Sequence, residues 1–319
     1  MGENEERGSV RPFPLSDIYE GRPGNSGAAR RIVLCHLESL TCLPALNLLF
    51  GVFGAQIGLV VSSRRFGEGH GGFFNQLVQT VRRSGIRMTF WLGFDLISAQ
   101  VVSALARWQA SIGQGQPALA TLPALARRHG ARLIETGDIN APETVEVIRA
   151  FAPDAVVVMN FDQILHPPVV EVPRIGVVNI HPSLLPSLRG PCPVFWALAE
   201  RRAVSGVTLH LIENARIDAG AILHQIEMPL DRRSSVAEVN TQLFLAGAGA
   251  LEGTLERLSM NAYRGRPQDP SAGQYRGFPS RAEMATARAQ GVQLCGLWHV
   301  VRLIAATLGI GRATFHRLS

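Results

Sequence analysis

Two short apolar runs constrain the fold of this chain more than any other feature. Residues 154–160 read DAVVVMN and residues 176–180 read GVVNI, and neither run alternates between apolar and polar positions. Strands of this kind are buried on both faces, as the central strands of parallel sheets are. A short, proline-rich stretch separates them. We therefore expect a parallel sheet covered by helices.

Strand-like and helix-like segments alternate on both sides of these runs. Upstream we expect strands at 31–36, 57–61 and 132–135, and helices at 40–53, 73–83, 124–129 and 142–151. Residues 87–110 are interpreted as one more strand followed by a helix. Downstream we expect strands at 206–212 and 221–226, and helices at 193–202 and 235–258. The alternation predicts an α/β fold with a doubly wound, mostly parallel sheet, which binds ligands where its strands end.

Three segments divide the chain. Residues 1–30 are rich in glycine, proline, arginine and acidic residues, and they predict a disordered arm instead of a signal peptide. Residues 31–258 form the predicted catalytic domain. Residues 259–319 begin as a polar loop and become helical over 294–308, which predicts a short C-terminal loop-helix appendage.

Composition excludes several classes of enzyme. The chain has 319 residues, 46% of them hydrophobic, enough for a full core. All 31 basic residues are arginine, so a P-loop and a pyridoxal Schiff base, which both need lysine, are excluded. Cys35, Cys42, Cys192 and Cys295 have no C-x-x-C spacing, so we expect buried thiols in a reduced, cytoplasmic protein without a metal site.

Charge and hydropathy are compatible with two kinds of partner, a nucleic acid and a membrane. A net charge of +6 would suit tRNA, but the arginines are scattered and lack interleaved aromatic residues. Residues 39–63 carry no charge over a length that could cross a bilayer, yet Pro44, Asn47 and Gln56 favour a helix, a turn and a strand. We expect no integral membrane span. Peripheral membrane contact through the apolar stretch 88–106 stays an alternative.

An amide and an imidazole stand side by side at the end of the second apolar run. Asn179 and His181 are two residues apart in an extended segment, so they share one face. Pro182 keeps His181 out of the helical region. Further along, Asp218 lies in a polar turn between apolar strands, from which a carboxylate can reach back to an imidazole. Each residue alone is compatible with a structural role.

Taken together, four motifs resemble a known family. The stretches NIHPSLLP, RGPCPVFWALAE, GVTLH and IDAGAIL are similar to the hallmark of folate-dependent formyltransferases, which include methionyl-tRNA, glycinamide ribonucleotide and sugar N-formyltransferases. The resemblance implies a Rossmann-like catalytic domain, catalytic roles for Asn179, His181 and Asp218, and 10-formyltetrahydrofolate as formyl donor, with no metal. It also implies that the pterin is held largely through backbone near the Asp218 turn and in the loop of Met159, Asn160, Phe161, Asp162, Gln163, Ile164 and Leu165.

The implied roles agree with the chemistry of formyl transfer. Asn179 would donate its amide hydrogen to the oxyanion that develops when an amine attacks the formyl group. His181, titrating near neutrality, would take or relay the proton. Asp218 would raise the pKa of His181, orient its ring and order a water molecule.

The acceptor is less constrained. Methionyl-tRNA formyltransferases carry a C-terminal β-barrel for which the segment after Ser259 looks too short, so a small amine or amino-sugar is favoured over methionyl-tRNA. Residues 64–115 are unusually apolar where the acceptor often docks, which would also suit an amphiphilic acceptor. Three alternatives remain open: a methionyl-tRNA formyltransferase, a hydrolase that releases formate from the same donor, and a folate-binding relative without turnover.

Overall fold

The computed structural model describes residues 30–64, 72–111, 119–260, 263–269 and 271–308. One sequence-based expectation, the disordered arm at 1–30, therefore lies almost entirely outside the described residues.

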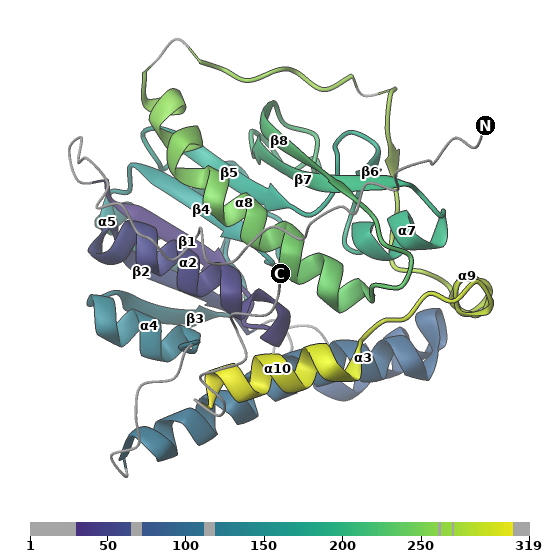
Figure 1. The fold of residues 1–319 in the computed structure, drawn as a ribbon. Coiled ribbons are helices and arrows are strands. Elements are labelled where there is room, and N and C mark those ends of the chain that lie inside the picture. The colour runs from purple at the N-terminus through teal and green to yellow at the C-terminus, as the bar shows by residue number, and fades with distance from the viewer. Residues whose placement is uncertain (1–29, 65–71, 112–118, 261–262, 270, 309–319) are drawn as a thin grey trace, which may run out of the picture.

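A seven-stranded sheet organises the molecule (Figure 1). Its order is β3-β2-β1-β4-β5-β7-β8, in which the five strands from β3 to β5 pair in parallel and β7 pairs antiparallel with both β5 and β8. The predicted mostly parallel sheet is confirmed. The strands are β1 (Ile32–His36), β2 (Ile57–Ser63), β3 (Arg132–Thr136), β4 (Ala155–Met159), β5 (Gly176–His181), β7 (Val204–Leu211) and β8 (Ile222–Pro229).

Helices cover both faces of this sheet. One face packs against α2, α4, α7 and α8, and the other against α5 and α6, so the sheet is doubly wound as predicted. The short 3₁₀ helices η1 (Leu40–Cys42) and η2 (Gly54–Gln56) flank α2. The helices are α2 (Leu43–Phe53), α4 (Leu122–His129), α5 (Pro142–Phe151), α6 (Pro167–Val170), α7 (Pro193–Ala199) and α8 (Val236–Ser259).

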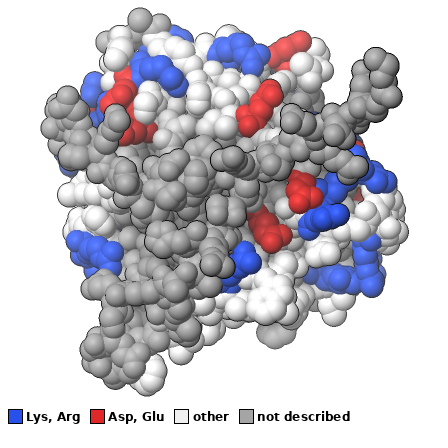
Figure 2. Space-filling view, in the orientation of Figure 1, with Lys and Arg blue, Asp and Glu red and all other residues white. Residues whose placement is uncertain are grey.

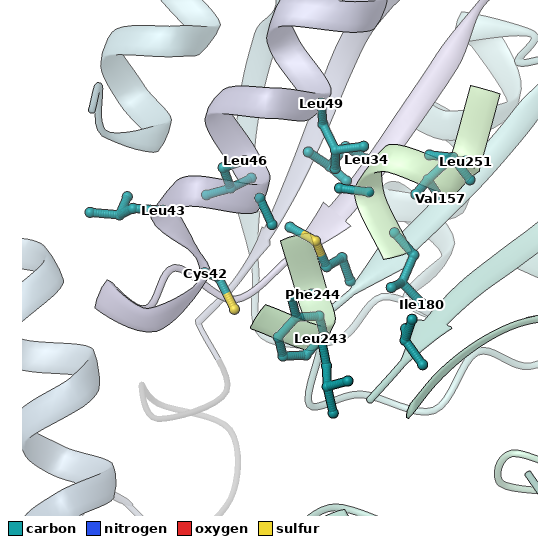
Figure 3. Close-up of a cluster of buried hydrophobic side chains, with 14 of the residues drawn as sticks. Leu34, Cys42, Leu43, Leu46, Leu49, Val157, Ile180, Leu243, Phe244 and Leu251 are labelled. Atoms are coloured by element: carbon teal, nitrogen blue, oxygen red, sulfur yellow. The ribbon is translucent and has the colours of Figure 1, made fainter. Parts of the chain in front are cut away.

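Burial on both faces explains why the central strands are apolar throughout. In β1, Ile32 and Leu34 face the helices of the larger core, whereas Val33 and Cys35 face the α5 side. Figure 3 shows Leu34 of the larger core among side chains from α2, β4, β5 and α8. The uncharged run at 39–63 forms η1, α2, η2 and β2, as predicted. Among the described residues, no helix is both long and apolar enough to cross a membrane.

The expectation of a strand within 87–110 is wrong. These residues belong to α3 (Gly72–Ser111), which is interrupted only at Gly85, where φ is 79° and ψ is 169°. Gly85 therefore ends the first helical stretch, as predicted, but a second helix follows at once. Met88, Ala99 and Val102 recur at helical spacing on its buried side. Apolar residues on the opposite side mask this period in the sequence.

The C-terminal segment folds back onto the domain. Beyond α8, β9 (Gln274–Tyr275) pairs in parallel with β6 (Leu188–Arg189). Two helices follow, α9 (Arg281–Ala289) and α10 (Leu297–Thr307), and both contact α3. The predicted helix at 294–308 is thus found as α10. Neither α9 nor the strand pairing was expected.

Candidate active site

The carboxyl end of β5 carries the first two predicted residues. Asn179 and His181 lie on the same face of β5, as their spacing requires. The strand pairs antiparallel with β7, which places Asn179 opposite His210 and His181 opposite Thr208. Directly opposed side chains in an antiparallel pair are within contact distance. This part of the sheet therefore presents polar side chains of two strands to one location.

The turn between β7 and β8 positions the third predicted residue. Asp218 adopts left-handed backbone geometry, with φ of 50°, a conformation that aspartate tolerates better than most residues. Gly220 follows where no side chain fits, because a Cβ atom there would lie 1.9 Å from the carbonyl oxygen of Leu211. The backbone N–H of Gly190 donates to Asp218 Oδ2 at 2.8 Å. The carboxylate is therefore held toward β5.

The three predicted residues converge. Asn179 Nδ2 donates to Asp218 Oδ1 at 3.3 Å, and His181 Nδ1 lies 3.5 Å from the same oxygen. These contacts join residues from two distant stretches of sequence. The central geometric expectation is therefore confirmed, whereas the catalytic roles stay predictions.

A fourth residue, His210, belongs to this cluster and was not predicted. Asn179 Nδ2 donates to His210 Nε2 at 3.0 Å, and His210 Nε2 lies 3.5 Å from Asp218 Oδ1. The side chain is almost fully buried. The sequence held a signal, since Thr208 and His210 in GVTLH repeat the two-residue spacing of Asn179 and His181. Recognising it required the pairing of β5 with β7.

Hydrogen bonds assign the tautomers of both imidazoles. His181 Nε2 lies 2.9 Å from the carbonyl oxygen of Leu188, so Nε2 carries the proton and donates. Its Nδ1 then presents a lone pair toward Asp218. His210 Nδ1 donates to the carbonyl oxygen of Leu211 at 2.8 Å, so its Nε2 accepts from Asn179. Both amide hydrogens of Asn179 are thereby engaged, one with His210 and one with Asp218.

Burial sets the charges of the cluster. It lowers the pKa of His181, although Asp218 and the Leu188 carbonyl act in the opposite direction. Asp218 acts on this pKa in the expected, upward direction, but the loss of solvent outweighs the carboxylate and the net shift is downward. Burial alone would raise the pKa of Asp218, but the two imidazoles and the Gly190 N–H bring it down to about 2. Near neutral pH His181 is neutral and Asp218 ionised, so hydrogen bonds from Gly190 and Asn179 stabilise the carboxylate.

Neighbouring residues bury most of the cluster. The side chains of His181 and Asp218 are 6% and 10% exposed. Gln268, from the segment after α8, donates to the carbonyl oxygens of Asp218 and Gly220 at 3.0 and 2.6 Å. A polar cavity of about 440 Å³ is lined by Leu188, Glu200, Arg202 and Arg276 among others. The cluster adjoins this cavity through Leu188 and does not line it.

The loop predicted to hold the pterin follows β4, beside the cluster. Its polar side chains are turned back into the protein: Asn160 Nδ2 donates to the Leu37 carbonyl at 2.9 Å, and Gln163 Nε2 donates to Ser63 Oγ at 2.7 Å. Leu165 is buried, and Phe161 packs against the smaller core. The carbonyl oxygens of Met159, Asn160 and Ile164 also accept hydrogen bonds within the protein, so the loop offers a ligand its remaining main-chain groups and the side chain of Ile164, which is 44% exposed.

The backbone conformation of Asn160 helps to shape this loop. Its φ of 49° turns the chain sharply at the carboxyl end of β4, where parallel sheets bind ligands. In the part of the chain that the structure describes, no group of three or more His, Cys, Asp and Glu residues is arranged to hold a metal ion.

Comparison with known proteins places the chain in a family. The model described as formyl transferase matches residues 68–251, more than half of the chain. The chain belongs to the formyl transferase family. A methionyl-tRNA formyltransferase of Synechococcus sp. (strain JA-3-3Ab) is 36% identical to this formyl transferase family member over 165 residues, which are 51% of each chain. That of Roseiflexus castenholzii is 35% identical over 185 residues, 58% of this chain and 59% of the relative.

This family member therefore spans about half the length of the curated relatives that it matches. Among solved structures, glycinamide ribonucleotide transformylase 1 from Symbiobacterium toebii is similar, with a TM-score of 0.48, 18% identity, and coverage of 76% of this chain and 96% of that one.

Proposed function

We propose that this protein transfers a formyl group from 10-formyltetrahydrofolate to an amine, and that Asn179, His181 and Asp218 carry the reaction. The convergence of the three side chains at the carboxyl end of β5 is the observation on which the proposal depends. Family membership supports the same reaction class.

In the transfer one bond forms, one bond breaks and two protons move. The acceptor nitrogen attacks the formyl carbon, the bond from that carbon to the folate nitrogen breaks, one proton leaves the amine and one reaches the departing nitrogen. His181 is suited to the first proton, because it is neutral near pH 7 and its Nδ1 carries the lone pair. Asp218, 3.5 Å from that nitrogen, would stabilise the imidazolium once it forms.

Asn179 would stabilise the oxyanion of the tetrahedral intermediate. Its amide hydrogens are engaged with His210 and Asp218, so the carbonyl oxygen of the substrate would replace one of these acceptors. A donor of this kind contributes about 3 to 4 kcal/mol in comparable sites. His210 would act through Asn179 as a positioning residue.

The loop after β4 would hold the donor through its backbone. The side chains of Asn160 and Gln163 are already occupied by protein partners, which keeps the loop in one conformation. Such an arrangement suits recognition of a pterin ring by main-chain groups at Met159 to Leu165, as the family resemblance implies.

A small amine or amino-sugar is the acceptor we favour. The cavity beside Leu188, about 440 Å³ in volume, is in the range of small-molecule sites. Its Arg202 and Arg276 both bond to Glu200, and the remaining positive charge would suit an amino-sugar linked to an anionic group such as a nucleotide. On the face that Figure 2 shows, arginines and acidic residues lie interspersed and do not form one basic patch of the kind tRNA binding favours.

Methionyl-tRNA is the second candidate, because relatives that are 34–38% identical in part of the chain are methionyl-tRNA formyltransferases. One assay distinguishes the two candidate acceptors. The full chain is incubated with 10-formyltetrahydrofolate and, in turn, amino-sugars, nucleotide-linked amino-sugars and charged initiator tRNA, and formylated acceptor and free formate are both measured. Formyl uptake by tRNA with a steep salt dependence would select the second candidate.

Two variants test the assignment of the site. His181→Ala and Asp218→Ala should each lower turnover by about two orders of magnitude or more while circular dichroism shows an unchanged fold. Near-normal transfer rates in either variant would contradict the proposal. Formate release without any acceptor would indicate the hydrolase, and donor binding without turnover would indicate a binding protein.

A further inference from the structure

The second half of α3 carries apolar side chains on the side that faces away from the core. Ile86 and Phe90 are 74% and 73% exposed, and three further residues on the same side are exposed as well, namely Ile97, Val101 and Leu105. Their spacing places all five on one helix face. Isolated exposed apolar residues are ordinary, but a continuous row along one helix marks an interaction surface.

This row does not hold α3 in place. The helix is attached through its opposite side, where Met88, Ala99 and Val102 are buried. Asp95 completes the attachment by accepting hydrogen bonds from the Thr41 backbone N–H and hydroxyl, both at 3.3 Å. The outward row is therefore not needed to pack α3 against the domain.

The neighbouring helix α10 repeats the arrangement. Val300, Leu303 and Ala306 pack against the core, whereas Leu297 and Trp298 are 75% and 73% exposed and Val301 is exposed beside them. Figure 1 shows α10 lying along α3. We call the outward residues of the two helices the apolar face: Ile86, Phe90, Ile97, Val101, Leu105, Leu297, Trp298 and Val301.

Exposed arginines flank the apolar face, whereas Glu238, the acid nearest the start of α10, accepts hydrogen bonds from Ser235 in the capping box of α8. Arg87 lies three residues before Phe90 and Arg302 four residues after Trp298, so each shares a helix face with an exposed aromatic ring, and both are exposed. Asp95, the acidic residue of α3, is turned inward onto Thr41. On α9, Glu283 accepts from the backbone N–H of Ser280 at 2.7 Å and so caps its own helix.

We propose that the apolar face binds the surface of an anionic membrane, with α3 and α10 lying in the plane of the interface. Apolar and aromatic residues flanked by arginine are what such helices present to lipid, and indole rings favour the level of the headgroups. A second copy of the chain docking through the same face would bring the exposed Arg87 and Arg302 of both copies into one interface, while Asp95 of α3 is turned inward onto Thr41. Anionic headgroups would neutralise these arginines.

Vesicle binding by the full chain tests this proposal. The protein should cosediment with vesicles of phosphatidylcholine and phosphatidylglycerol, bind vesicles of phosphatidylcholine alone much less, and dissociate as salt rises. Trp298→Gln and Phe90→Ser should each weaken binding about tenfold, the effect of removing one large buried apolar side chain. Met260→Gln and Val204→Ser, which change exposed apolar residues outside the apolar face, should leave binding unchanged.

Three results would overturn the proposal. The first is no cosedimentation with anionic vesicles at low salt. The second is equal loss of binding in the control variants. The third is a dimer in sedimentation equilibrium that Trp298→Gln dissociates while the wild-type protein ignores vesicles, which would assign the face to a second copy. The proposal does not depend on formyl transfer, because both measurements proceed without donor or acceptor.

Discussion

The side-chain amide of Asn179 donates a 3.0 Å hydrogen bond to Nε2 of His210 across the antiparallel pair of β5 and β7. The bond fixes which way the amide points, and the Nδ1 proton that His210 donates to Leu211 fixes the imidazole in turn. If Asn179 stabilises the oxyanion, the orientation of its amide group, and with it the reaction rate, depends on His210.

Replacing His210 should impair catalysis without removing a reacting group. In His210→Ala, Asn179 loses its acceptor and rotates, so we expect kcat to fall by about tenfold to a hundredfold while the KM for the formyl donor changes little. His210→Gln, which can retain an acceptor toward the amide, should recover part of the rate. His224→Gln on β8 serves as the matched control. Equal losses in kcat for the alanine and glutamine variants would argue against a positioning role.

Gln268 should support the turn that presents Asp218. Its amide donates to two carbonyl groups of that turn, at Asp218 and Gly220. Gln268→Ala should therefore lower kcat about tenfold, since the carboxylate loses its fixed position, while the free energy of unfolding falls by only about 1 to 2 kcal/mol. Steady-state kinetics and urea denaturation measure the two effects. A drop in stability alone, with kcat intact, would refute the link.

Two glycines should respond in opposite directions to the same substitution. Gly253 is exposed within α8 with free space where a Cβ would lie, so Gly253→Ala should stabilise the protein by about 0.5 to 1 kcal/mol. Gly220→Ala should lower both turnover and stability sharply, because its Cβ would collide with the Leu211 carbonyl at 1.9 Å. Thermal melts and transfer assays on both variants provide the check. Normal turnover in Gly220→Ala would mean that the turn adapts.

Two buried groups outside the cluster of Asn179, His181 and Asp218 should have opposite effects on the pH dependence of stability between pH 4 and 6. Burial lowers the pKa of His36 to about 4, so the unfolded chain binds more protons and stability falls as pH drops from 6.5 toward 4. Burial raises the pKa of Asp95 to about 6 despite hydrogen bonds from Thr41, so the folded chain binds more protons and stability falls as pH rises from 3.8 toward 6.

Asp95→Asn should reveal the effect of His36 alone on the pH dependence of stability. We expect this variant to be more stable than wild type above pH 6, by up to about 3 kcal/mol, and no more stable near pH 4, with a steeper loss of stability in acid. Urea titrations at pH 4, 5, 6 and 7.5 measure it. Glu146→Gln, which changes an exposed residue of α5, serves as the control. The sign assigned to Asp95 would be wrong if the variant gained stability at pH 4 instead.

Local sequence signals gave a correct view of the sheet. The apolar runs at 154–160 and 176–180 became β4 and β5 because strands covered on both faces need no polar positions. The two-residue spacing of Asn179 and His181 placed them on one face for an equally local reason. The helical stretch after Gly85 was misread because its two apolar sides hid the period of 3.6 that identifies a helix.

By itself the sequence determined the kind of sheet, most of its elements and three residues of the site, since periodicity and spacing act between near neighbours. Only the tertiary structure brought Asp218 within 3.5 Å of His181, added His210 through the β5–β7 register, and buried His181 deeply enough to lower its pKa. These outcomes depend on which strands pair and on how much solvent is excluded, and both are decided by contacts between residues far apart in the chain.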